Sequence, residues 1–257
     1  MSDTDILTRR DGAVLELRFN RPAKKNAITN AMYAVLADGF EAAAADKSVR
    51  AILITAEGDL FSAGNDLMDF AAQNSGAFAG PRHVERFLTR MIEAEKPVVA
   101  AVQGDAVGVG ATMLLHCDLV YVGEAARLIT PFVNLALVPE NASSLTLPGR
   151  IGHVRAFEML GLCEPLRGAE AARLGIANAA LPPPEVEPRA RAAAHTLTQK
   201  PAESLRLTKA MMRDKHAAMA RMREEMAVFG ERLRSPEAAE AFAAFMERRA
   251  PDFSKLG

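Results

Sequence analysis

Glu140 is the residue of this sequence whose surroundings best suit acid–base chemistry, because it lies in an apolar segment. Glu140 follows the apolar residues 137–138 and a proline, and Ala142 lies just beyond it. Apolar surroundings disfavour the charged form of a carboxyl group, so we expect its pKa to rise towards that of a useful general base. The alternative is a solvated acid in the first turn of a helix that includes Ser143 and Ser144, and these residues alone favour that simpler interpretation.

Two glycine-containing turns follow apolar stretches and can bring backbone N–H groups close to a ligand. Residues 104–110 (GDAVGVG) follow the stretch 97–102, and residues 61–66 (FSAGND) follow the stretch 49–55. A strand, a glycine turn and a helix together point N–H groups at negative charge. The glycine spacing does not match the dinucleotide-binding fingerprint, and the Gly-Lys-Ser/Thr of a phosphate-binding loop does not occur. Either turn alone is also compatible with an ordinary surface turn.

The elements that must position these residues alternate between strand and helix in the first half of the chain. Residues 13–19 alternate as a half-buried strand does, and the stretches 49–55 and 97–102 are typical of strands covered on both faces. Thr29 is a plausible N-cap for a helix that reaches about Asp46, and further helices are expected at 81–93 and from 107 onward. This alternation predicts an α/β layered fold.

Beyond Gly168 the strand signals end, and the rest of the chain is predicted to be helical. Residues 181–184 (LPPP) are interpreted as a linker. The helices expected after it cover 185–197, 202–212, 216–233 and 236–248. We therefore divide the chain into a core of residues 1–195, which would hold the ligand, and a helical C-terminal region of residues 196–257.

Composition and charge exclude several other classes of protein. The 257 residues are 49% hydrophobic and 25% charged, as in a globular protein, and the formal net charge of −1 gives no general affinity for nucleic acid or an anionic membrane. Cys117 and Cys163 are the only two cysteines, and no Cys or His cluster has ligand spacing, so we expect neither a disulfide framework nor a metal site. Without a secretory signal or an apolar span, the protein is expected to be cytoplasmic.

Taken in order, five segments carry a resemblance to a known family. They are residues 20–27 (NRPAKKNA), 63–66 (AGND), 104–110, 117–121 (CDLVY) and 243–253 (AAFMERRAPDF). Over nearly its whole length the chain resembles the crotonase (enoyl-CoA hydratase/isomerase) superfamily. The resemblance implies a crotonase-like spiral of β-β-α turns with a helical C-terminal trimerisation region. It also implies an acyl-CoA thioester as substrate, with coenzyme A as part of that substrate and no separate cofactor, and a homotrimer or hexamer.

The resemblance also assigns roles to residues of this sequence. The backbone N–H groups of Asn65 and Val109 would form an oxyanion hole that stabilises a thioester enolate. Hydratases of the family use two glutamates, but this sequence has Thr112 and Phe132 at those positions. The pattern around Glu140 looks like that of Δ3,Δ2-enoyl-CoA isomerases of peroxisomal type, in which one glutamate moves a proton from C2 to C4. Asn141 replaces the glycine that commonly follows this glutamate.

The expected activity is therefore the conversion of a 3-enoyl-CoA into a 2-trans-enoyl-CoA. Two alternatives remain open, a hydratase that uses one carboxylate with another polar group and a non-catalytic relative that binds acyl-CoA or acts as a scaffold, while the near-neutral charge counts against RNA binding. His116 is expected to be a packed core residue, and the methionines of residues 211–226 are expected to fill a core or a subunit interface. The residues expected to contact the substrate are Ala23, Lys24, Ala63, Gly64, Gly108, Phe132, Phe253 and Lys255.

Overall fold

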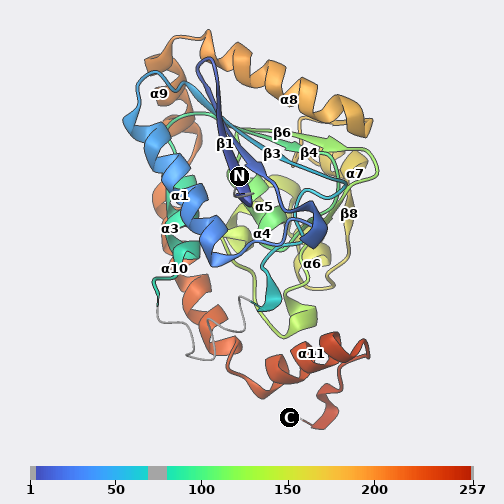
Figure 1. Ribbon diagram of the computed structural model, residues 1–257. Helices are drawn as coiled ribbons and strands as arrows, with labels where there is room; N and C mark the ends of the chain where they lie inside the picture. The colour runs from blue at the N-terminus through green and yellow to red at the C-terminus, as the bar shows by residue number, and fades with distance from the viewer. Residues whose placement is uncertain (1–3, 69–79, 256–257) are drawn as a thin grey trace.

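The computed structural model describes residues 4–68 and 80–255 and contains two sheets (Figure 1). The larger sheet has the order β1-β2-β3-β4-β6-β9, in which β1 and β2 form an antiparallel hairpin and the other neighbours are parallel. Its strands are β1 (Ile6–Asp11), β2 (Val14–Phe19), β3 (Ala51–Ala56), β4 (Val98–Val102), β6 (Leu119–Gly123) and β9 (Ala179–Leu181). The smaller sheet consists of β5 (Ala106–Val107), β7 (Arg127–Ile129) and β8 (Leu166–Arg167).

Helices cover both faces of the larger sheet. Leu53 and Val99 pack with α8 (Pro183–Thr198), which lies across the top of the sheet in Figure 1. Their neighbours Ile52 and Val98 face the opposite way, into a core shared with α1 (Asn30–Ala45) and α3 (His83–Glu93). Successive side chains of a strand point to opposite faces, so a strand covered on both sides must be apolar throughout. The prediction of an α/β fold with buried central strands is confirmed.

The remaining helices position the C-terminal half of the chain. α10 contacts α3 and α5, and α11 contacts η3, so these C-terminal helices pack against the two elements that flank the loop of Glu140 (Figure 1). The remaining α-helices are α4 (Val109–Thr112), α5 (Ser143–Ile151), α6 (His153–Leu160), α7 (Gly168–Arg173), α9 (Ala202–Met212), α10 (Lys215–Arg232) and α11 (Pro236–Glu247). Short 3₁₀ helices are η1 (Pro22–Lys24), η2 (Met113–His116), η3 (Val133–Leu135) and η4 (Phe253–Lys255). The predicted helical C-terminal region is confirmed.

Two sequence-based expectations about the fold were wrong, and one was confirmed. Strands do not end at Gly168, because β9 pairs with β6 at the edge of the larger sheet. The prolines after Leu181 are not a linker, since Pro183 begins α8, where a missing N–H costs no hydrogen bond. The Thr29 side chain caps α1 by accepting a hydrogen bond from the Met32 N–H at 3.3 Å, as predicted. The division at residues 195 and 196 stays a prediction.

Membrane and metal sites can be assessed for the described part of the chain. No helix in residues 4–68 and 80–255 combines the length and the apolar character needed to cross a bilayer. Within the same residues, no three His, Cys, Asp or Glu side chains are grouped so that they could hold a metal ion.

Candidate active site

Glu140 is a buried carboxyl group with a single hydrogen bond. Glu140 is 7% exposed, and the Thr112 hydroxyl donates a hydrogen bond to its Oε1 atom at 2.6 Å. Oε2 has no hydrogen-bond partner within the described residues. Burial raises the pKa of Glu140 to about 7, opposed by the Thr112 hydrogen bond and assisted by the charge of Glu225. The interpretation as a solvated first-turn acid was wrong, and the predicted rise in pKa is supported.

Glu140 shares a cavity of about 240 Å³ with Asn65, so the structure brings together two of the three predicted catalytic residues. The cavity lies between the 61–66 turn, α1, α3 and α10. Its other described lining residues are Ile28, Tyr33, Asp66, Arg82, Val84, Glu85, Leu88, Met226, Phe229, Gly230 and Leu233. The wall is therefore largely apolar, with a few polar groups, as is typical of small-molecule sites.

The two glycine-containing turns lie against each other. Ser62 forms a parallel bridge with Ala106, and the Val107 N–H donates to the Ser62 carbonyl at 2.9 Å. Gly64 has φ +83°, and a Cβ at this position would lie 2.8 Å from the Val107 carbonyl oxygen. Only glycine can combine this backbone conformation with such a close approach. The structure thus places the segment before Asn65 directly beside the segment before Val109.

The two N–H groups predicted to form the oxyanion hole are unpaired within the described residues, and Val109, which is 1% exposed, does not line the Glu140 cavity there. Neither Asn65 nor Val109 uses its N–H in a hydrogen bond to another described residue. The Asn65 side chain is occupied, because the Tyr33 hydroxyl donates to its Oδ1 at 2.6 Å. Val109 begins α4 and Thr112 ends it, and residues three apart lie on one side of a helix. One short helix therefore carries a predicted donor and the hydroxyl that holds Glu140.

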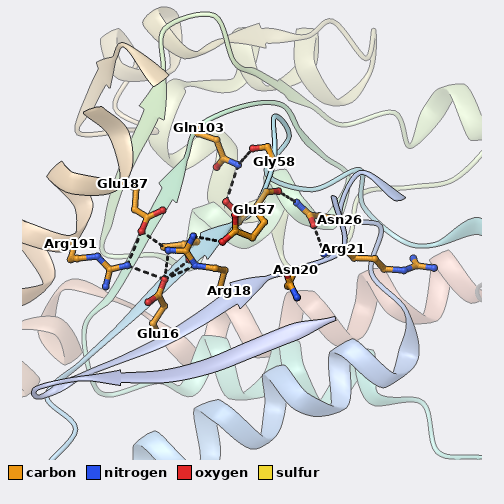
Figure 2. Close-up of polar contacts among 12 residues, drawn as sticks. Glu16, Arg18, Asn20, Arg21, Asn26, Glu57, Gly58, Gln103, Glu187 and Arg191 are labelled. Carbon is orange, nitrogen blue, oxygen red and sulfur yellow. Dashed lines mark hydrogen bonds and ion pairs between the residues drawn. The ribbon is translucent and has the colours of Figure 1, made fainter. Parts of the chain in front are cut away.

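Two amide side chains, one from the buried Asn26 and one from the half-buried Gln103, hold the loop that leads into the 61–66 turn. Asn26 donates from Nδ2 to the carbonyls of Glu57 and Leu60 at 2.8 and 2.9 Å, and its Oδ1 accepts from the Arg21 N–H (Figure 2). Gln103 donates to the Gly58 carbonyl at 2.8 Å. A loop whose carbonyls are bonded from two sides has little freedom, so the turn that carries Asn65 has a fixed starting point.

An ion-pair network joins the same loop to the sheet and α8. Glu16 on β2 is 3% exposed and accepts from Arg18, from Arg191 of α8 and from Thr55 (Figure 2). Arg18 also donates to the Glu57 side chain at 2.8 Å. Burial alone would raise the pKa of Glu16, but these hydrogen bonds outweigh it and hold the pKa below its ordinary value.

The predicted substrate-contact residues occupy varied environments. Ala23 and Lys24 are exposed in η1, and the Ala63 N–H donates to the Lys25 carbonyl at 2.9 Å. Phe132 is 6% exposed and does not line the Glu140 cavity within the described residues. Gly108, with φ +54° and ψ −121°, precedes α4, while Phe253 is 39% exposed in η4, which ends at Lys255. Their contacts with a substrate stay predictions.

His116 holds the segment after Glu140 and is a packed residue, as predicted. It is 1% exposed, and burial lowers its pKa to about 4, so the ring is neutral near pH 7. Arg213 approaches Nδ1 at 3.3 Å, and because a guanidinium can only donate, Nδ1 must accept. The proton therefore lies on Nε2, which donates to the Asn141 carbonyl at 2.7 Å.

Sequence reasoning missed several residues of this site. Tyr33 and the α10 side chains Met226 and Phe229 line the cavity, although the methionines were expected to fill only a core or an interface. Glu225 on α10 is 7% exposed and approaches the segment after Glu140. Its position among Met222, Met226 and Phe229, at helical spacing, is the signal that could have identified it, since a glutamate on an apolar helix face is uncommon.

Asn141 has a left-handed backbone conformation, which glycine adopts more easily than any other residue. Its φ is +59°, and neither Nδ2 nor Oδ1 of its fully buried amide has a hydrogen-bond partner. We expect Asn141→Gly to be more stable than Asn141→Ala by about 1 kcal/mol, because both remove the unpaired amide but only alanine keeps a Cβ in the left-handed region. Urea denaturation measures the difference, and equal stabilities of the two variants would contradict it.

Comparisons with known proteins show the family of this chain. Residues 9–255 match the family model for enoyl-CoA hydratase/isomerase. The chain is 34% identical to enoyl-CoA delta isomerase 2 of Rattus norvegicus over 250 residues, which cover 95% of this chain and 64% of that protein. It therefore spans just under two thirds of the length of that relative. It is also 31% identical to a probable enoyl-CoA hydratase of Bacillus subtilis, with 94% of each chain covered.

Solved structures give the same result for the fold. The crystal structure of an enoyl-CoA hydratase/isomerase from Pseudoalteromonas atlantica is 39% identical, with a TM-score of 0.92 over 97% of this chain and 100% of the other. The structure of OdaA from Pseudomonas aeruginosa is 45% identical, with a TM-score of 0.90 over 95% and 99% of the two chains. The two sheets, the paired turns and these similarities lead to one conclusion: the chain belongs to the enoyl-CoA hydratase/isomerase family and has the crotonase fold.

Proposed function

We propose that this protein is an enoyl-CoA isomerase that converts 3-enoyl-CoA into 2-trans-enoyl-CoA with Glu140 as its only acid–base group. The observation that carries the proposal is the environment of Glu140. It is a buried carboxyl group with a pKa of about 7, one oxygen held by Thr112 and the other unpaired, in the cavity that also contains Asn65. A base with a pKa near the working pH is the most efficient in proton transfer.

Thr112 and Phe132 are the residues that argue against hydration. Hydratases that resemble this chain place glutamates at both positions, where they hold and activate water. A threonine here donates its hydroxyl to Glu140, and Phe132 is apolar and buried. Isomerisation needs no activated water and therefore no second carboxylate.

The proposed reaction is a 1,3-proton shift. The ionised Glu140 removes a proton from C2 of the 3-enoyl thioester, and the electrons of that C–H bond delocalise onto the thioester oxygen. The N–H groups of Asn65 and Val109 stabilise this dienolate. Protonated Glu140 then returns the proton to C4, which leaves the double bond between C2 and C3. Removing one donor of this kind typically lowers the rate by about 10²–10³-fold.

Coenzyme A would remain bound as part of the substrate throughout. Lys24, exposed in η1, would meet its phosphates, and the backbone of Ala63 would lie along the pantetheine. Phe253 and Lys255 would complete the nucleotide site, and the working assembly would be a homotrimer or a hexamer. No nucleic acid, membrane or metal takes part in this proposal.

A hydratase is the second candidate, favoured by two further carboxyl groups at the cavity. Asp66 and Glu85 both line it. Asp66 accepts a hydrogen bond from Arg21 at 2.6 Å, and this ion pair compensates its negative charge. Glu85 is exposed at the start of α3. If Glu85 activated water, Glu85→Gln would abolish hydration of 2-enoyl-CoA.

An absorbance assay separates the two candidates. Isomerisation of 3-hexenoyl-CoA creates a conjugated thioester, so the ultraviolet absorbance of the enoyl group rises. Hydration of 2-hexenoyl-CoA consumes the same absorbance. We expect a fast rise with the first substrate and a much slower loss with the second. A fast loss with the second substrate that persists in Glu140→Gln would overturn the proposal.

The pH dependence of kcat/KM should report the ionisation of Glu140. The base must be ionised to accept the C2 proton, and its pKa in the folded protein is about 7. Below that value kcat/KM should fall about tenfold for each pH unit, and above it a plateau is expected. Initial rates between pH 5 and 9 measure the profile. An acid limb near pH 4.5, the ordinary value for glutamate, would show that Glu140 is not the base.

A further inference from the structure

The segment between Glu140 and α5 has a strained backbone. Asn141 and Ala142 follow one another in the left-handed region, with φ of +59° and +56°. Residues with a Cβ rarely adopt this conformation, and two in succession need support from their surroundings. Any movement of these two residues would be passed directly to Glu140, which precedes them in the chain.

Glu225 provides that support from the C-terminal helical region. One carboxylate oxygen accepts from the Ala142 N–H at 2.5 Å, and the other accepts from the Ser144 N–H at 2.9 Å and from the Ser144 hydroxyl at 2.5 Å. Glu225 is 7% exposed, and α10 packs against α5. A buried carboxylate that accepts several hydrogen bonds to its charged form is strongly bound, so these contacts hold the turn firmly.

Glu225 also acts on Glu140 through its charge. The Glu225 carboxylate contacts the backbone two residues beyond Glu140, at the Ala142 N–H, and its negative charge is the smallest of the contributions to the pKa of Glu140, which it raises. Burial raises the pKa of Glu225 itself, against the hydrogen bonds from Ser144 and Ala142. The adjacent Glu224 is exposed and pairs with Arg221, so the two neighbouring glutamates have different environments.

We propose that Glu225 is a positioning residue, which from α10 holds the left-handed turn at Asn141 and Ala142 and thereby fixes the carboxyl group of Glu140 in the cavity. The inference rests on the proposed isomerase function for its effect on rate. It has two separable parts, because the hydrogen bonds of Glu225 support the turn and its charge tunes the proton affinity of Glu140. The C-terminal helical region would thus contribute to catalysis within its own chain.

The test compares Glu225→Ala and Glu225→Gln with the matched control Glu224→Ala. We expect Glu225→Ala to lower kcat about 10²-fold, the usual cost of a misplacement of about 1 Å, with KM changed only a few-fold. Glu225→Gln keeps one acceptor and should lose less. In both variants the acid limb of kcat/KM should move to lower pH. Glu224→Ala should leave kcat and the limb unchanged.

A glycine at position 142 separates the two parts. In the double variant Glu225→Ala/Ala142→Gly the left-handed turn no longer needs the hydrogen bonds of Glu225, because glycine adopts this conformation without cost. We expect kcat to recover at least tenfold relative to Glu225→Ala, while the acid limb stays at lower pH, since the charge is still missing. The other charged groups at the cavity, Asp66, Arg82 and Glu85, and Arg221 beside Glu225 are the same in every variant.

A direct titration makes the outcome independent of the isomerase assay. The ¹³C shift of the Glu140 carboxyl carbon should give a lower pKa in Glu225→Ala than in the native protein. An unshifted titration together with a native kcat would overturn the inference. If the native protein lacked isomerase activity, the proposed function would fail, and the two parts of the inference would still be tested. The titration would test the charge effect of Glu225. Urea denaturation would test its support of the turn, because Ala142→Gly should then stabilise Glu225→Ala more than it stabilises the native protein.

Discussion

Glu140→Gln is expected to lose isomerase activity almost completely. An amide cannot accept the C2 proton, and general acid–base catalysis of this kind contributes about 10²–10⁴-fold to the rate. The substitution keeps the shape of the side chain and an oxygen that can accept from Thr112, so the cavity should be preserved. The measurement is kcat with 3-hexenoyl-CoA, accompanied by the affinity for hexanoyl-CoA, which should change little.

The same variant should gain stability at high pH. The pKa of Glu140 is raised from its ordinary value of 4.5 to about 7 in the folded protein. A raised carboxyl pKa favours folding fully below about pH 4.5, and this contribution is lost as the pH rises through 7. At pH 8 the native protein therefore carries a penalty of roughly 3 kcal/mol that glutamine removes. Urea midpoints should show a more stable variant at pH 8 and a small difference at pH 4.5, and a variant destabilised at both would contradict this account of the burial of Glu140.

Gly64→Ala should have the second largest effect. The new Cβ would lie 2.8 Å from the Val107 carbonyl oxygen, so the turn before Asn65 and the turn before Val109 would have to separate. Both N–H donors would then move away from the thioester oxygen, and we expect kcat to fall about 10²–10³-fold. The measurement is kcat at a temperature where circular dichroism shows that the variant is folded.

Gly175→Ala is the matched control for this prediction. Gly175 has φ +84°, almost the same as Gly64, but a Cβ there meets no atom within 4 Å. Both substitutions place alanine in an equally unfavourable backbone conformation, and only the one at Gly64 adds a collision between the two turns. We expect Gly175→Ala to lose stability and keep native kcat. A native kcat in Gly64→Ala as well would mean that the two turns do not form one oxyanion site.

The central strands could be predicted from local sequence, because a strand buried on both faces consists of consecutive apolar residues. β3 is buried on both faces, so residues 51–56 are nearly all apolar, and β4 follows the same rule. β9 could not be predicted, because its three residues are too few for a pattern and its partner β6 lies far away in sequence. The strand forms where the edge of the sheet offers hydrogen bonds, which is a tertiary effect.

The candidate site was predictable in its chemistry and less so in its supports. The residues around Glu140 alone favoured a solvated acid, and it was the resemblance to the family that identified Glu140 as the base and named Asn65, which the structure places in the same cavity. The contribution of Glu225 to the site could not be predicted, because its burial depends on which face of α10 packs against α5. Local sequence does not encode that contact, and only the helical spacing of Glu225 with Met222 and Met226 hinted at it.

A crystal structure with bound hexanoyl-CoA, the saturated analogue of 3-hexenoyl-CoA, tests the central claim most directly. The account predicts that the thioester oxygen accepts hydrogen bonds from the Asn65 and Val109 N–H groups, at about 2.7–3.1 Å. It also predicts that the unpaired Oε2 of Glu140 faces C2 and C4 from one side of the acyl chain. A thioester oxygen bound elsewhere, or a different side chain between C2 and C4, would contradict it.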